Sequence, residues 1–238
     1  MGNTAKLFLL PVDIGNKDLS FSIPELNKAI ISKIELFVCE NVKTARRFLI
    51  NSELQSPIPE EIQFISLSND DNIFLIKEII TQIKNGKNCA YLSEAGNPCI
   101  ADPGEKLVLK AHEENIEVKP LIGPSSILLA LISSGCNAEK FTFSGYLNRK
   151  TDLREHEIKK LISDVNIGIT QIFMETPYRN NGLLKDLLHL CPDHFLLTIA
   201  SELTTESEYI KTKSIQNWKA QIPDLHKKPV IFVLGIDY

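Results

Sequence analysis

Three loops in this sequence combine small, polar and proline residues directly after an apolar stretch. They read "SEAGNPCIADPG" (93–104), "GPSS" (123–126) and "PVDIGN" (11–16). In an open α/β sheet, the loops that follow the strands line the ligand site. Gly96 allows a positive φ or a close approach of the backbone to a ligand. Because "SEAGNP" is longer than a strand-to-helix turn requires, we interpret it as a candidate ligand contact.

Each loop also has a purely structural interpretation. Asp102, Pro103 and Glu105 have the residue types of a helix start, with Asp102 as the N-cap and Pro103 at the first helical position. "GPSS" opens a helix whose free N–H groups would suit a carboxylate or a phosphate, but a capped helix explains it equally well. Neither G-x-G-x-x-G nor a Walker A sequence occurs, so the usual nucleotide-binding motifs are absent.

Other kinds of chemistry find less support. The segment "HLCPDH" holds His189, Cys191 and His194, but the spacing matches no standard zinc pattern, so we predict no metal. A serine hydrolase would need a G-x-S-x-G nucleophile elbow, which the sequence lacks. The mixed-charge segment 149–160 favours a solvated helix face, with a contact to RNA phosphates as the alternative.

The order of apolar segments predicts an α/β protein with two domains. Over the first 120 residues, apolar strands alternate with amphipathic helices, which indicates a mostly parallel sheet with helices on both faces. Beyond that point five strand candidates are separated by two helices, near 152–163 and 180–190, with a hairpin around "TTES". We therefore predict an N-terminal α/β domain over 1–120 and an α+β domain with a mixed sheet over 121–238.

Composition sets outer limits on the function. The net charge of −4 gives no overall attraction for nucleic acid or anionic membranes, although a local basic patch is still allowed. The five cysteines have irregular spacing and no C-x-x-C pair, which favours a reducing compartment. No apolar run approaches the roughly 18 residues that span a bilayer, and "LFLLP" is too short for a signal sequence. The sequence predicts a cytoplasmic protein without a membrane segment.

Taken in order, these segments resemble the tetrapyrrole methylase superfamily of S-adenosylmethionine-dependent methyltransferases. The similarity is greatest to the branch that methylates a cytidine ribose 2′-hydroxyl in small-subunit rRNA. It extends over nearly the whole chain. The segments that carry it are "PVDIGN", "ELFVCENVKTARRFL", "LSEAGNPCIADPG", "GPSSILLALISSGCNAEKFTFSGYL", "IFMETPYR", "ASELTTESEYI" and "PVIFVLG".

The resemblance implies a two-domain homodimer with S-adenosylmethionine in a cleft between the domains. It also implies which residues contact this methyl donor. From the first domain and the junction these are Ser93, Glu94, Ala95, Gly96, Ile100, Ala101, Ser125 and Ser126. From the second domain they are Met174, Leu203, Pro229 and Val230, the last two near the adenine.

The chain departs from the family pattern mainly at polar positions expected to face the acceptor. No histidine follows the third strand, in "SLSNDDN", and the run Ser201–Thr205 lacks the family's two basic residues. Three functions therefore stay open: methylation of rRNA, methylation of a small molecule or tetrapyrrole, and donor binding without catalysis. A hydroxyl acceptor needs a base, and the matching motifs offer Glu40, Glu175 and Glu202 without a basis for choosing among them.

Overall fold

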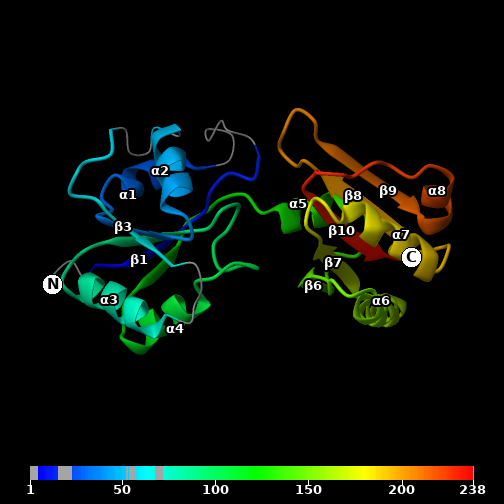
Figure 1. Cartoon of the computed structure of the whole chain (residues 1–238), viewed down its shortest axis with the longest axis horizontal. Helices are drawn as coiled ribbons and strands as arrows, with labels where there is room; N and C mark the ends of the chain where they lie inside the picture. Colours follow the sequence, from blue (N-terminus) through cyan, green and yellow to red (C-terminus); the bar gives the residue numbers. More distant parts are fainter. Residues whose placement is uncertain (1–4, 16–22, 52, 54–56, 68–71, 238) are drawn as a thin grey trace. The chain divides into compact units, whose positions relative to one another are not determined.

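The computed structural model describes residues 5–15, 23–51, 53, 57–67 and 72–237. They fold as two compact units, Met1–Ser125 (unit 1) and Ser126–Tyr238 (unit 2). Each unit has its own five-stranded sheet (Figure 1). Asn16 of "PVDIGN" and 68–71 of "SLSNDDN" lie outside the described residues.

Strands and helices alternate along unit 1, and every strand of its sheet runs parallel to its neighbours in the order β3-β2-β4-β1-β5. The elements in chain order are β1 (Leu7–Leu10), α1 (Glu25–Ile31), β2 (Leu36–Cys39), α2 (Val42–Asn51), β3 (Gln63–Ser66), α3 (Ile73–Lys84), β4 (Cys89–Leu92), α4 (Glu105–Glu113) and β5 (Val118–Pro120). This arrangement confirms the predicted parallel α/β sheet.

Helices cover both faces of the unit 1 sheet, which explains why its central strands are apolar at every position. All four residues of β2 and of β4 are buried. On one face, Ile31 of α1 and Leu49 of α2 pack against Phe37. On the other, α3 and α4 pack side by side, with Ile79 and Leu107 in the same cluster (Figure 1). A strand enclosed in this way gains from apolar side chains in both directions.

Unit 2 contains a mixed sheet in the order β6-β7-β10-β8-β9. β6 and β7 are parallel, and the other neighbouring pairs are antiparallel. Its elements are α5 (Ser126–Ser134), β6 (Phe141–Tyr146), α6 (Thr151–Asn166), β7 (Thr170–Met174), α7 (Asn180–Leu190), β8 (Leu196–Ser201), β9 (Tyr209–Ser214), α8 (Ile215–Ala220) and β10 (Val230–Gly235). The predicted mixed sheet and the β8–β9 hairpin are both confirmed.

The main core of unit 2 lies between its sheet and the helices α6, α7 and α8. Ile158, Leu184 and Trp218 bring the three helices into one apolar cluster with the sheet residue Phe232. The Trp218 indole N–H donates to the carbonyl of Leu197 at 2.8 Å, which satisfies a polar group inside that core. α5 packs against β8, β9 and β10.

The sequence prediction of only two helices between the strands of unit 2 is wrong, because α8 forms a third. α8 has six residues, and Ser214 caps it by accepting a hydrogen bond from the Asn217 N–H at 3.2 Å. So short a helix has no clear periodicity, and its stability comes from burial of Ile215 and Trp218 rather than from its own sequence.

The prediction that Asp102 caps the following helix is also wrong. α4 begins at Glu105, its N-cap position is Gly104 with φ +120°, and no side chain caps it. The Tyr91 hydroxyl donates to the carbonyl of Pro103 at 2.6 Å, and a Cβ on Gly104 would lie 2.4 Å from the Tyr91 ring. With these contacts, α4 starts two residues later than predicted, and the Asp102 carboxylate does not cap it.

We expect Leu184→Ala to lower the free energy of unfolding of unit 2 by about 2–5 kcal/mol, because a fully buried leucine leaves a cavity. Trp218 is the only tryptophan of the chain, so its fluorescence in urea reports on unit 2 alone. The neighbouring Lys185→Ala, on an exposed position, should change the midpoint little. Equal midpoints for the two variants would contradict the packing described for this core.

Candidate functional site

The loops after β4, β1 and β5 meet at one edge of the unit 1 sheet, because these strands are parallel neighbours. The Val12 N–H donates to the Gly96 carbonyl at 2.9 Å, and the Gly96 N–H donates to the Asp13 carbonyl at 3.4 Å. The Asn97 side-chain amide donates to the Pro124 carbonyl at 3.1 Å. Residues 40–41, which follow the neighbouring strand β2, lie at the same edge. We call this surface the rim, and it consists of residues 11–15, 40–41, 93–104 and 121–125.

Two glycines let the loops of the rim approach one another closely. Gly96 has φ +69°, and a Cβ built there would lie 3.2 Å from Cγ2 of Ile14. A Cβ on Gly123 would lie 2.2 Å from Cγ of Pro11, which no side chain could tolerate without a shift of the backbone. The close approach suggested for Gly96 by the sequence is therefore seen between protein segments.

The loop after β4 is held in an uncommon backbone conformation. Cys99 and Ala101, which are not glycines, have φ of +66° and +60°. Each such residue costs on the order of 1–3 kcal/mol and persists only where the surroundings fix it, as at ligand sites. The length and strain of this loop together exceed what a connection from β4 to α4 requires.

The predicted donor residues of unit 1 are distributed along the rim. Ser93 is buried, and its hydroxyl lies within hydrogen-bonding distance of the carbonyls of Ala95 and Gly96, at 3.3 and 3.4 Å, so that it shapes the turn. Ser125 is half-buried at the end of the rim. The exposed members of the set are Glu94, Ala95, Ile100 and Ala101. A ligand at the rim would therefore meet these four residues before it met Ser93.

Three carboxylates, Glu40, Glu94 and Asp102, interact electrostatically at the rim. Partial burial raises the pKa of the Glu40 carboxyl, and the charges of Asp102 and Glu94 raise it further. Burial and then the charge of Glu94 raise the pKa of Asp102 in the same way. Among the described residues, Oε1 of Glu40 is buried without a hydrogen-bond partner. Like charges held together at a partly buried site are suited to a cationic group.

Sequence reasoning missed this carboxylate cluster, since it assigned Asp102 to a helix cap. The available signal was the recurrence of an acidic residue just after two buried strands, at Glu40 after β2 and at Glu94 after β4. Parallel neighbouring strands bring such residues to the same edge. β2 and β4 are neighbours in the sheet, which brings Glu40 to the edge where Glu94 lies.

The predicted donor residues of unit 2, apart from Ser126 at the start of α5, lie at one end of its sheet. Met174 pairs with Ile231, and Val230 pairs with Ser201, which brings the end of β7 and the end of β8 beside the start of β10. The Glu202 N–H donates to the Pro229 carbonyl at 3.0 Å. Leu203 follows directly, so Met174, Leu203, Pro229 and Val230 are brought together.

These four residues differ in what they can offer a ligand. Val230 is 4% exposed and belongs to the apolar core, and Leu203 is 5% exposed. Met174 is half-buried and Pro229 is exposed. A ligand at this end of the sheet would therefore meet the side chains of Met174 and Pro229, and mainly the backbone at the other two positions.

The structure distinguishes among the three carboxylates that the sequence offered as a base. The Glu175 side chain is 1% exposed, accepts a hydrogen bond from the Thr176 N–H at 2.6 Å and forms an ion pair with Arg179. These contacts commit Glu175 to holding the start of α7. Glu202 lies 3.7 Å from the Lys228 ammonium and is more open, with its side chain 25% exposed.

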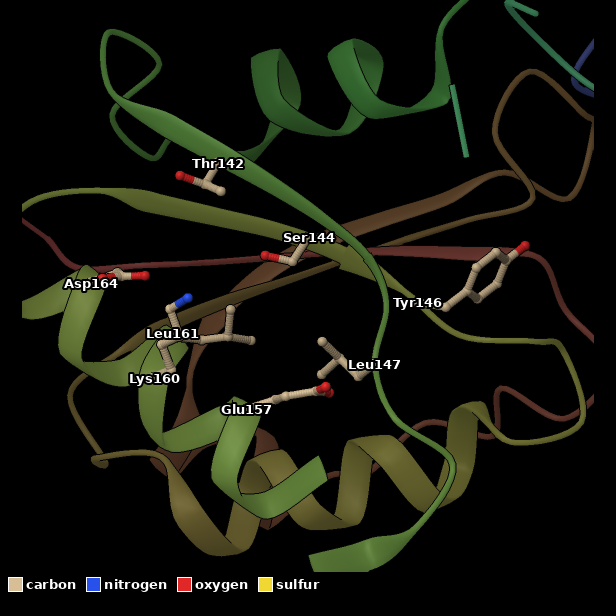
Figure 2. A pocket seen from close by; sticks show the side chains of 8 residues that line it. All are labelled: Thr142, Ser144, Tyr146, Leu147, Glu157, Lys160, Leu161 and Asp164. Atoms are coloured by element: carbon tan, nitrogen blue, oxygen red, sulfur yellow. The ribbon is translucent and has the colours of Figure 1, made fainter. Parts of the chain in front are cut away.

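A separate open pocket of about 200 Å³ lies in unit 2 between β6 and α6 (Figure 2). Its lining side chains come from β6, from α6 and from Leu147 just after β6, and none of them is a predicted donor residue. They are Thr142, Ser144, Tyr146, Leu147, Glu157, Lys160, Leu161 and Asp164.

Among the described residues, no group of three or more His, Cys, Asp or Glu side chains could hold a metal ion, and no helix is long and apolar enough to cross a membrane.

Comparison with known proteins assigns the family. The family model of Tetrapyrrole (Corrin/Porphyrin) Methylases matches residues 29–218. Ribosomal RNA small subunit methyltransferase I of Buchnera aphidicola subsp. Schizaphis graminum is 29% identical, with 98% of this chain and 79% of the relative covered. The protein of the same name from Synechocystis sp. is 30% identical, over 88% of this chain and 71% of the relative.

Solved structures share the fold at low sequence identity. Diphthine synthase matches with a TM-score of 0.69 and 12% identity, over 98% of this chain and 90% of that one. The methyltransferase CobJ matches with a TM-score of 0.65 and 16% identity, over 98% and 94%. With the family match, these findings confirm the resemblance drawn from the sequence: the chain belongs to the tetrapyrrole (corrin/porphyrin) methylase family and is a methyltransferase.

Proposed function

We propose that this methyltransferase transfers a methyl group from S-adenosylmethionine to a ribose 2′-hydroxyl of small-subunit rRNA. Relatives over nearly the full chain bear the name of a small-subunit rRNA methyltransferase, and the resemblance of the motifs implies the ribose hydroxyl. The observation that carries the donor assignment is the carboxylate cluster of the rim, where Glu40 has a buried oxygen without a partner among the described residues.

The rim suits this donor because S-adenosylmethionine carries a sulfonium and an ammonium group. Glu40 and Asp102 have raised pKa values because burial and neighbouring carboxylates disfavour their charged forms. A cationic ligand would offset that repulsion, which is strong where water is partly excluded. We assign Ser93–Gly96, Ile100, Ala101 and Ser125 to the donor in unit 1, and Ser126, Met174, Leu203, Pro229 and Val230 in unit 2.

When bound, the donor supplies an electrophilic methyl group on its sulfonium sulfur. The contribution of the chain is then mainly to position the donor against the acceptor hydroxyl, which can lower the barrier by several kcal/mol, up to about 10. The hydroxyl proton needs an acceptor. The carboxylates of Glu40 and Glu202 are less engaged in hydrogen bonds and close ion pairs than the carboxylate of Glu175.

A second function, methylation of a small-molecule or tetrapyrrole acceptor, is favoured by one observation. The segment at the end of β8, Ser201–Thr205, lacks the two basic residues that the rRNA branch has there.

The homodimer and the cytoplasmic location expected from the sequence stay predictions, as does the alternative of donor binding without catalysis.

We expect Gly96→Val to reduce the affinity for S-adenosylmethionine at least tenfold in titration calorimetry. A branched side chain at φ +69° is strained, and its Cβ would press on Ile14. Gly182→Ala is the matched control, since a Cβ there meets nothing within 4 Å and lies in helix α7, where alanine is favoured. Unchanged affinity in Gly96→Val would show that the donor does not bind at the rim.

Donor affinity should rise with pH across the range of the raised carboxyl pKa values, which lies above the usual 4.5 of Glu40 and 3.8 of Asp102. A cation binds the charged carboxylates, so affinity is lost as the pH falls through those values and protons are released on binding. Calorimetry in buffers of different ionisation enthalpy measures the release. Glu40→Gln should reduce it, whereas Glu78→Gln at an exposed position of α3 should not. Equal proton release in both variants would contradict a cation at Glu40.

Wild-type protein should transfer the labelled methyl of S-adenosylmethionine to small ribosomal subunits from cells that lack this enzyme. Digestion of the labelled rRNA to nucleosides should yield a 2′-O-methylated nucleoside. Label in a small-molecule fraction and none in rRNA would favour the second function. Donor binding without transfer to either would leave the chain as a binding protein.

A further inference from the structure

Helix α2 has a charge unlike that of the chain as a whole. The protein has a net charge of −4, yet the ten residues of α2, "VKTARRFLIN", contain Lys43, Arg46 and Arg47 and no acidic residue. The carboxylates nearest in the sequence, Glu40 and Glu53, both lie outside the helix. A local charge of +3 in an acidic protein is a feature that the donor site does not explain.

The three basic side chains share one face of the helix. Their spacing of i, i+3 and i+4 makes them neighbours on the helix surface, and all three are exposed. The opposite face is buried through Ala45 and Leu49. We call Lys43, Arg46 and Arg47 the basic face of α2.

The charges of the basic face are open to a ligand. Within the described ranges, none of the three side chains forms an ion pair with a carboxylate. The Arg46 guanidinium lies over the ring of Phe64, 4.4 Å from its centroid. Stacking of this kind holds the plane of the guanidinium and leaves its N–H groups able to donate to phosphate oxygens.

The position of α2 connects this face to the rim. The helix begins two residues after Glu40, and its first turn is fixed by Asn41, whose side-chain oxygen accepts from the Lys43 N–H at 2.9 Å and the Thr44 N–H at 3.3 Å. A ligand held along the basic face would therefore run toward the end of β2 that contributes to the rim.

We propose that the basic face of α2 binds the phosphate backbone of the RNA acceptor. This inference rests on the proposed function, since it names the surface of the same enzyme that holds its substrate. RNA is the partner that fits, because an array of cations without carboxylates complements regularly spaced phosphates. It also explains how a protein with an overall negative charge, and without basic residues in Ser201–Thr205, can bind RNA.

The test replaces Lys43 and Arg47 together by glutamine and keeps Arg46, whose packing on Phe64 contributes to the fold. The probe is a fluorescein-labelled 20-nucleotide RNA stem-loop, and its affinity is measured by anisotropy from 50 to 200 mM KCl. K43Q/R47Q should bind about tenfold more weakly at 100 mM, and the slope of log affinity against log salt should be smaller by about 1.5, at roughly 0.7–0.9 per phosphate contact. The KM for small ribosomal subunits should rise to a similar extent.

The control K33Q/K77Q also removes two charges, from exposed lysines after α1 and on α3. It should leave the RNA affinity and the salt slope within a factor of two of the wild type. Equal losses in both double variants, or no loss in K43Q/R47Q, would overturn the proposal.

Titration calorimetry with S-adenosylmethionine separates this inference from the proposed function. K43Q/R47Q should bind the donor as the wild type does, and a parallel loss of donor affinity would overturn a role confined to RNA. If the wild type methylates ribosomal subunits and K43Q/R47Q does so with an unchanged KM, the docking surface fails while the function stands. If the wild type methylates no RNA, both fail together.

Discussion

The candidate site depends on one constraint, which is that the loops after β1, β4 and β5 must pack closely against one another. The hydrogen bond from the Val12 N–H to the Gly96 carbonyl closes the gap between two of them, and Pro11 fills the space beside Gly123. No side chain fits at either glycine without displacing a neighbour. Parallel strands bring the loops to one edge, but these contacts turn three separate loops into one surface.

The same constraint makes the electrostatics of the rim possible. A loop free to move would let Glu40, Glu94 and Asp102 separate, because like charges at a partly buried site repel. Instead the Tyr91 hydroxyl and the hydrogen bonds of Gly96 hold the loop that carries two of the three carboxylates, in spite of the positive φ angles of Cys99 and Ala101. A bound cation would relieve the repulsion among these carboxylates, which is a physical basis for preferring a sulfonium donor.

The sequence was sufficient for the fold wherever a local pattern determines the structure. Buried strands such as β2 and β4 and the amphipathic α3 were predicted from apolar runs and helical spacing alone. The sequence was not sufficient where a contact between residues far apart in the chain determines the local structure. α8 depends on burial of Trp218 against strands far away in the sequence, and Asp102 has the chemistry of a helix cap but loses that role to the contact of Tyr91 with Pro103.

The predicted donor residues show the same limit. Motif resemblance named positions that the structure does bring together within each unit, as with Met174 and Val230 at one end of the unit 2 sheet. It did not distinguish a side chain that faces a ligand from one that fills the core, and Val230 is of the second kind. Every residue of β10 is buried, because the strand pairs on both sides and helices pack on the sheet, and the motif specifies neither of these contacts.

The acidic and basic side chains of this chain lie in separate places, and the net charge of −4 describes neither place. Unit 1 has acidic residues at the rim and only basic charges on α2, although the two are adjacent along the chain at Glu40 and Lys43. A methyltransferase acting on RNA has to bind a cationic donor and a polyanionic acceptor at once, and each would be repelled by the surface that attracts the other. The boundary between β2 and α2 separates the two kinds of charge, which is the arrangement that the proposed donor and RNA contacts would need in an acidic protein.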